Sequence, residues 1–193
     1  MPVDYKHSAI FIHIPKTGGR AVSKLMGIER NSKKNLYFRH LTHMPLTMIE
    51  DYVDSKYFYI FTFVRNPYTR ITSEYAWRMR NINSIVYNEP TDRWLSFPDY
   101  MERLLDRWDR LSDKWNERAH VIPQVDYITD DRINIFRYEN IKEDCDFLMD
   151  KFSIYKKLEV VNKSDGKPKH TDRTKEITRI LYKEDFERFN YKK

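Results

Sequence analysis

One stretch of this sequence limits the fold more than any other. The run KYFYIFTFV, Lys56–Val64, is apolar or aromatic on both of its alternating faces. A strand of this kind belongs in the middle of a parallel sheet, where helices bury both faces. Shorter β-rich runs at Ala9–Ile14 and Arg132–Phe136 are separated from it by segments with helical spacing. The sequence therefore predicts an α/β fold with a mainly parallel central sheet flanked by helices.

The segments between these strands predict the helices that cover the sheet. Apolar residues at helical spacing, or a proline that can begin a helix, mark Ala21–Gly27, a short segment from Pro45, Tyr68–Arg80, Asp99–Arg118, Ile141–Phe152 and Arg173–Phe189. Long polar loops are expected over residues 81–98 and 156–171. A chain of 193 residues with no repeat and no linker is expected to form one domain, residues 1–193.

The first predicted strand leads into a loop that is typical of phosphate binding. In IFIHIPKTGGRAV the strand is followed by Pro15, Lys16, Thr17, Gly18 and Gly19, and this loop holds two of the chain's 4 glycines. A turn from strand to helix directs backbone N–H groups and the amino end of the helix at one point, which attracts anions. Glycines allow a close backbone approach. The alternative is a plain turn that carries a surface lysine.

The spacing of this loop differs from that of loops that bind nucleoside triphosphates. Those loops have four residues between their glycines and end in Gly-Lys-Ser or Gly-Lys-Thr. Here Lys16 precedes both glycines, and Arg20-Ala21 stands where a metal-binding hydroxyl would be. A magnesium nucleotide is therefore not expected, and no other part of the sequence suggests a metal.

The central strand ends in an arginine. Arg65 directly follows the strand, and Ser73 lies about two helical turns into the segment after it. A guanidinium and a hydroxyl can converge there on one phosphate. The alternative is an arginine that caps a neighbouring helix and an ordinary helix serine. Ligands of open α/β sheets bind at the carboxyl ends of the strands, so both motifs lie where a ligand is expected.

Composition adds weaker constraints. The net charge of +6 favours an anionic ligand, but small phosphates, acidic glycans and nucleic acid all qualify, and solubility alone is an equal explanation. The single cysteine, Cys145, excludes an internal disulfide and a multi-cysteine metal site. No apolar run approaches ~18 residues and no signal peptide is visible, so we expect no membrane span. If Met1 is the native start, the protein is expected to be cytoplasmic.

The two strand-end motifs together resemble the sulfotransferase superfamily that uses 3′-phosphoadenosine-5′-phosphosulfate (PAPS). The resemblance rests on PKTGG after the first strand and on VRNP with its downstream serine. It implies a P-loop-like fold without a metal, in which the first loop grips the 5′-phosphosulfate and the second motif binds the 3′-phosphate. By position, the implied 5′ site comprises Lys16, Thr17, Gly18, Gly19, Arg20 and Ala21, and the implied 3′ site comprises Arg65 and Ser73. Hydroxyl residues are usual in the family where this chain has Arg20 and Ala21, so the role of Arg20 stays open.

Further stretches resemble the carbohydrate-type branch of this superfamily. THMPL resembles its GHxPL segment, HVIPQVDYITD its HxxPQxDYL segment, and NIFRYENIKEDCDFL its RFENLxxDF segment. VNKSDG and ILYKEDFERFNY resemble its xNKS loop and its closing helix. The resemblance runs from about Ile10 to Tyr191. It implies a small-molecule sulfate donor and a hydroxyl acceptor, with a sugar as the first expectation and no nucleic acid.

Sulfuryl transfer assigns roles to single residues. The reaction needs both partners positioned in line, the developing negative charge stabilised, and the acceptor's proton removed. Lys16 would stabilise charge on the leaving phosphate, and the resemblance places His43 at the family's catalytic histidine. His13 is a rival base that we expect to be structural. The remaining candidates are His40, His120 and Gln124, which are expected near the acceptor, and His120 and Glu74 as alternative bases.

Two other classes of function stay open at this stage. A metal-dependent small-molecule kinase of the P-loop class would need magnesium and a side chain to hold it. A non-catalytic module that binds an anionic ligand would use the basic residues and the tryptophans Trp94, Trp108 and Trp115. The loop lacks the hydroxyl that the kinase would need, and the binding module gives no reason for Lys16, Arg65 and Ser73 to coincide at strand ends.

Overall fold

The structure is a computed structural model that describes residues 3–28, 42–80, 95–111, 115–159 and 166–193. The chain divides into two compact units. Unit 1 contains Met1–Arg65 and Asp126–Asn162, and unit 2 contains Asn66–Val125 and Lys163–Lys193. The chain therefore passes from unit 1 to unit 2 directly after Arg65, at the end of the central strand.

Unit 1 is built on a sheet with the strand order β1-β2-β3-β4. The short β1 (Val3–Asp4) is antiparallel to β2 (Ala9–Ile12). β3 (Tyr59–Val64) runs parallel to β2, and β4 (Asn134–Arg137) runs parallel to β3. This arrangement confirms the predicted α/β class with a mainly parallel sheet. The carboxyl ends of β2, β3 and β4 therefore lie at one edge of the sheet.

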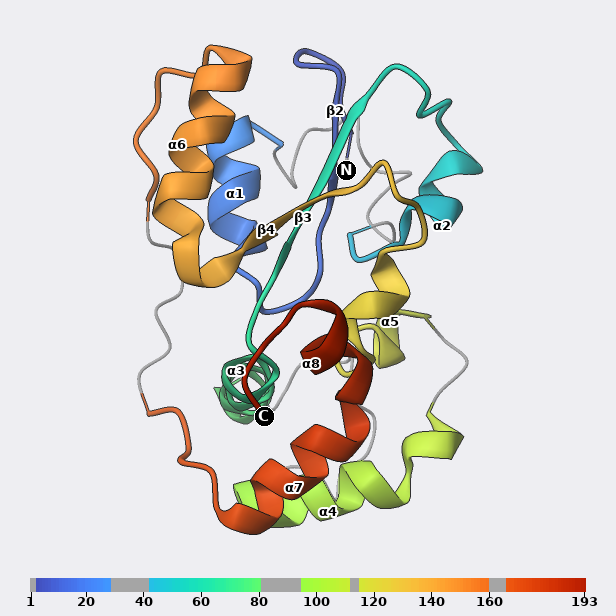
Figure 1. Cartoon of the computed structure of the whole chain (residues 1–193), viewed down its shortest axis with the longest axis vertical. Helices are drawn as coiled ribbons and strands as arrows, with labels where there is room; N and C mark the ends of the chain where they lie inside the picture. The colour runs from blue at the N-terminus through green and yellow to red at the C-terminus, as the bar shows by residue number, and fades with distance from the viewer. Residues whose placement is uncertain (1–2, 29–41, 81–94, 112–114, 160–165) are drawn as a thin grey trace. The chain divides into compact units, whose positions relative to one another are not determined.

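Two helices cover one face of this sheet, as Figure 1 shows: α1 (Gly19–Met26) and α6 (Ile141–Phe152). Their apolar sides meet the aromatic side chains of the strands in one core, which contains Ala9, Phe11, Val22, Leu25, Met26, Phe61, Phe63, Cys145, Leu148 and Ile154. The rings of Phe11 and Phe61 stack across β2 and β3 with centroids 5.0 Å apart. The short α2 (Leu46–Glu50) lies on the other side of the sheet. β2 and β3 are thus buried on both faces, as the apolar run of β3 predicts, whereas β4 is partly exposed.

Unit 2 is helical in its described part. Its helices are α3 (Pro67–Arg80), α4 (Phe97–Asp106), α5 (Trp115–Arg118), α7 (Asp172–Leu181) and α8 (Lys183–Arg188), with the 3-10 turn η3 at Trp108–Arg110. α4 and α7 lie side by side (Figure 1). The core of this unit contains Ile71, Phe97, Tyr100, Met101, Leu104, Val121, Ile177, Leu181, Tyr182 and Phe186. Two more 3-10 turns lie elsewhere in the chain. η4 (Gln124–Tyr127) spans the boundary between the units, and η5 (Tyr138–Asn140) belongs to unit 1.

Two predictions of secondary structure were wrong, and one short strand was missed. The helix predicted over Asp99–Arg118 is broken, because α4 ends at Asp106 and Leu111 adopts an extended conformation after η3. The helix predicted over Arg173–Phe189 is two helices. Tyr182 separates them with a φ of −119°, and its hydroxyl donates a hydrogen bond of 2.7 Å to the carbonyl of Val121. The two-residue β1 was not predicted, because so short a strand leaves no alternation to detect.

Candidate active site

The loop between β2 and α1, residues 13–18, has an unusual backbone. Lys16 and Gly18 both have left-handed conformations, with φ values of 70° and 86°. A lysine in this region costs about 1–2 kcal/mol, so the surrounding loop must hold it there. Thr17 is fully buried, and its hydroxyl donates a hydrogen bond of 2.8 Å to the carbonyl of Ile14. Left-handed residues within a turn direct successive N–H groups inward, which is typical of backbone concavities that bind anions.

The two glycines of this loop are needed for different reasons. At Gly18 the left-handed φ favours glycine, and an added Cβ would lie 2.6 Å from Cδ1 of Ile141. At Gly19 the backbone is helical, but an added Cβ would lie 1.9 Å from Cδ2 of His13. The absence of side chains at Gly18 and Gly19 therefore lets the start of α1 pack closely against two segments. One is the turn after β4, and the other is His13, which follows β2.

The amino end of α1 suits an anion. Its N-cap, Gly18, contributes no side-chain hydrogen bond, and the first turn contains no acidic residue. The first N–H groups of a helix have no partner inside the helix and carry its positive end. Arg20 lies in this first turn and is exposed, whereas Ala21 is on the buried side of the helix.

Arg65 contacts the loop directly. Its side chain is only 5% exposed, and its Nη1 donates a hydrogen bond of 3.0 Å to the carbonyl of Lys16. Its Cζ lies 4.1 Å from the centre of the Tyr138 ring. The carboxyl ends of three parallel strands thus bring together Lys16, Arg65 and Tyr138. The sequence predicts the first two, whereas Tyr138 lies in the stretch that resembles the family's RFENLxxDF segment but was assigned no role in the site.

His43 contacts the residue that directly follows β2. Its Nδ1 lies 2.8 Å from the carbonyl oxygen of His13. A carbonyl can only accept, so Nδ1 carries the hydrogen, and the neutral ring has its lone pair on Nε2. The two imidazole rings lie 4.5 Å apart, and the ring of His13 also stacks on Phe11. α2 begins after Pro45, whose side chain makes no capping hydrogen bond.

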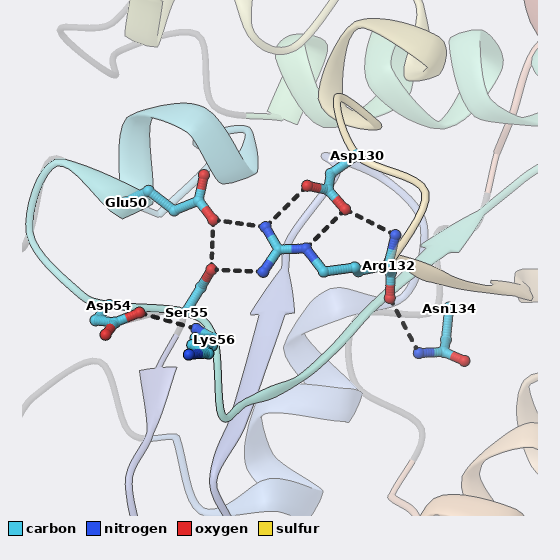
Figure 2. Close-up of polar contacts among 7 residues, drawn as sticks. All are labelled: Glu50, Asp54, Ser55, Lys56, Asp130, Arg132 and Asn134. Carbon is cyan, nitrogen blue, oxygen red and sulfur yellow. Dashed lines mark hydrogen bonds and ion pairs between the residues drawn. The ribbon is translucent and has the colours of Figure 1, made fainter.

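A polar cluster at the opposite edge of the sheet holds α2 in place (Figure 2). Arg132, just before β4, donates to Glu50 of α2 at 2.8 Å and to Ser55 at 3.1 Å. Asp130 accepts two further hydrogen bonds from the same guanidinium, and the pKa of Asp130 is lowered by them. Ser55 also donates to Glu50. The cluster lies before β3 and β4, away from the loop, so we assign it a structural role in anchoring α2 and the turn that carries His43.

Four further predicted site residues, Ser73, Glu74, His120 and Gln124, lie in unit 2. Ser73 is buried on α3. Glu74, also on α3, is fully buried and accepts hydrogen bonds from Nδ1 of His120 and Nε of Arg78, each at 3.0 Å. The ring of His120 stacks on Trp77 at 5.0 Å. His120 and Glu74 therefore form a pair, whereas the convergence of Arg65 and Ser73 on one phosphate stays a prediction.

Gln124 has a structural partner. It is fully buried, and its Nε2 donates a hydrogen bond of 3.0 Å to Asp185, which also accepts from the N–H of Val125. Burial raises the pKa of Asp185, and the nearby Arg70 opposes this effect. A role of Gln124 at the acceptor stays a prediction. Two predicted binding residues, His40 and Trp94, lie outside the described residues.

Within the described ranges, no group of three or more histidine, cysteine, aspartate or glutamate side chains could hold a metal ion. Cys145, on the inner side of α6, is fully buried, and burial together with Asp144 and Asp146 raises its pKa to about 12. Its thiol is therefore protonated at neutral pH and unsuited to nucleophilic attack. Over the same part of the chain, no helix has the length and apolar character needed to cross a membrane.

Comparison with known families agrees with this geometry. No curated protein and no solved structure gives a match. The sequence model described as "Sulfotransferase family" matches residues 1–192, nearly the whole chain. Sulfotransferases transfer a sulfuryl group from a sulfate donor to an acceptor. The chain therefore belongs to the sulfotransferase family and is an enzyme of that class.

Proposed function

We propose that this enzyme transfers the sulfuryl group of PAPS to a hydroxyl acceptor, with a carbohydrate as the first candidate, and that residues 1–193 act as one sulfotransferase domain. The observation that carries the proposal is the contact between Arg65 and the β2–α1 loop. It joins two motifs that are 49 positions apart in sequence through the hydrogen bond to the carbonyl of Lys16. Each motif alone fits many anions, whereas a loop and an arginine at adjacent strand ends fit a ligand with two separate phosphate groups.

The donor site is proposed to divide between these motifs. The N–H groups of the β2–α1 loop and of the first turn of α1 would bind the 5′-phosphosulfate, with Lys16 and Arg20 supplying positive charge. Arg65 and Ser73 would bind the 3′-phosphate. Thr17 would act mainly by holding the loop through its hydrogen bond to Ile14.

The proposed catalytic residues are His43 and Lys16. PAPS, when bound, would supply the sulfuryl group. His43 would take the acceptor's hydroxyl proton on Nε2, because Nδ1 donates to the carbonyl of His13 and thereby fixes the tautomer. Lys16 would stabilise the negative charge that develops on the oxygen of the leaving phosphate. A sulfuryl group carries less negative charge than a terminal phosphoryl group, so protein cations can meet this requirement without a metal.

Calorimetric titration tests the donor assignment. We expect adenosine 3′,5′-bisphosphate, the product of the reaction, to bind in the presence of EDTA, and ATP with magnesium to bind much more weakly. The matched acceptor test is incorporation of sulfate from PAPS into hydroxyl-bearing sugars. Binding of ATP as tight as that of the bisphosphate, or loss of binding in EDTA, would show that the chain uses a different donor.

A further inference from the structure

Tyr138 contacts both Arg65 and the β2–α1 loop, although the resemblance of its segment to the family assigns it no role. It begins η5, directly after β4. One face of its ring covers the guanidinium of Arg65, with Cζ 4.1 Å from the ring centre. The edge of the same ring lies against the β2–α1 loop, because a Cβ added at Gly18 would come within 3.0 Å of its Cδ2. The tyrosine therefore contacts both the arginine and the loop.

The contact has the geometry of a cation–π interaction. A guanidinium within about 6 Å of an aromatic ring centre is attracted to the ring face, and the attraction increases when the cation is desolvated. Arg65 is only 5% exposed. The flat ring and the hydrogen bond to the carbonyl of Lys16 together restrict the rotation of a side chain that otherwise has many rotamers. A guanidinium whose plane is fixed before binding loses less conformational entropy when it binds a phosphate.

We propose that Tyr138 is a positioning residue for the 3′-phosphate of the donor. The ring holds the guanidinium of Arg65 in one orientation beside the loop, so that the arginine is ready to bind the 3′-phosphate. This inference rests on the proposed function, because it assigns the reading of the 3′-phosphate to Arg65. It also requires the ring of Tyr138 and not its hydroxyl, which distinguishes a positioning role from direct binding of the ligand by the phenol.

Phe136, which lies on β4 two residues before Tyr138, offers a matched control. Its ring packs against Phe63, with centroids 5.4 Å apart, in the core between the sheet and α6. Replacing Phe136 with leucine therefore removes an aromatic ring two residues before Tyr138 and perturbs packing. A general loss of packing in unit 1 would affect the Phe136 and Tyr138 variants alike.

The test measures the affinities of adenosine 3′,5′-bisphosphate and 5′-AMP by calorimetry for the wild type, Tyr138→Phe, Tyr138→Leu and Phe136→Leu. We expect Tyr138→Leu to weaken binding of the bisphosphate by about 3- to 30-fold, the range of a cation–π contact, and to change binding of 5′-AMP much less. Tyr138→Phe keeps the ring and should bind both ligands within about twofold of the wild type. Phe136→Leu should keep the wild-type ratio of the two affinities. If Tyr138→Leu does not fold, Tyr138→Met takes its place, since methionine fills the space without a π face.

Each outcome bears on one of the two proposals. Equal losses for both ligands in Tyr138→Leu, or a loss in Tyr138→Phe as large as that in Tyr138→Leu, would overturn the role of the ring. Arg65→Ala is the reference variant, in which the preference for the bisphosphate should largely disappear. A wild type that binds 5′-AMP as tightly as the bisphosphate would instead overturn the proposed donor site itself.

Discussion

Gly19 lies so close to the imidazole of His13 that a larger residue would displace the ring. The Cβ of an alanine would fall 1.9 Å from Cδ2 of His13, and this ring contacts His43. Gly19→Ala should therefore destabilise the protein and lower turnover, although alanine is otherwise about 1 kcal/mol better than glycine in a helix. Chemical denaturation measures the first effect and a sulfate-transfer assay the second.

A double-mutant cycle separates this clash from other effects of the substitution. In a His13→Ala background the added methyl group has room, so Gly19→Ala should be neutral or stabilising there, by up to about 1 kcal/mol. The same destabilisation in both backgrounds would show that His13 is not the reason for glycine at this position.

The base assignment predicts a separation between turnover and donor binding. His43→Ala should reduce turnover by about 10²–10⁴-fold, because it removes the proton acceptor. The affinity for adenosine 3′,5′-bisphosphate should stay near that of the wild type, since the base acts on the acceptor. Lys16→Ala should instead impair both turnover and binding, because in the proposed site Lys16 would contact the phosphosulfate before and during transfer. Single-turnover kinetics and calorimetry distinguish the two patterns.

His120→Ala is the control for this assignment, because His120 and its partner Glu74 are the alternative base in unit 2. Near-normal turnover by His43→Ala together with a large loss in His120→Ala would transfer the role to the His120–Glu74 pair.

Single residues show how far sequence reasoning reaches. Lys16 and Arg65 were predicted to lie near each other, because each follows a parallel strand and such strands share a carboxyl edge. The hydrogen bond from Arg65 to the Lys16 carbonyl adds a contact that position alone does not give. The contacts of His43 with His13 and of Tyr138 with Arg65 were not predictable. They join segments that are 30 and 73 positions apart and depend on side-chain directions that no local pattern encodes.

At the scale of the helix, a half-buried histidine, His170, lies just before the start of α7, and its protonation affects stability. Thr171 and Thr174 form a capping box at this end, and the preceding His170 donates from Nε2 to the carbonyl of Tyr68 at 2.9 Å. Burial lowers the pKa of His170, and Lys175 adds to this effect, while the hydrogen bond to Tyr68 opposes it. The neutral ring is therefore the form that suits the folded state.

This pKa shift predicts the sign of a pH effect on stability. The unfolded chain binds the proton at an ordinary histidine pKa of about 6.5, before the folded protein does. The contribution of the neutral His170 ring to stability is thus fully present above this pH. It is lost as the pH falls from about 6.5 to the lowered pKa of the folded protein. Denaturation at a series of pH values should show a smaller loss below about pH 6.5 for His170→Gln than for the wild type. Identical pH profiles would exclude His170 as a source of the acid sensitivity.

The helix boundaries mark the limit of pattern reasoning at this scale. The period of apolar residues predicted α6 with its bounds, because the pattern runs without interruption from Ile141 to Phe152. The same pattern gave a wrong prediction at Tyr182. This residue fits the apolar period, but it leaves the helical conformation, and its hydroxyl donates a hydrogen bond to the carbonyl of Val121. A buried hydroxyl needs a partner, and this tertiary requirement overrides local helix propensity.

For the whole molecule, the proposed donor should act as a stabilising ligand. A ligand that binds only the folded state at a hundred times its Kd adds about 2.7 kcal/mol to the free energy of unfolding. For a chain of 193 residues this corresponds to a rise in Tm of roughly 5–10 °C. Adenosine 3′,5′-bisphosphate should produce this shift in EDTA, and differential scanning calorimetry measures it.

Two arginine variants show whether this stabilisation comes from the proposed site or from the net charge of +6. Arg173 is exposed and paired with Glu102 and Glu176, so Arg173→Ala lowers the net charge without touching the β2–α1 loop. It should keep the full Tm shift. Arg65→Ala lowers the net charge equally but removes the guanidinium beside Lys16, and most of the shift should disappear. Equal losses in the two variants, or an equal shift of the wild type by ATP, would mean that the ligand is bound by overall charge and not by the ends of the strands.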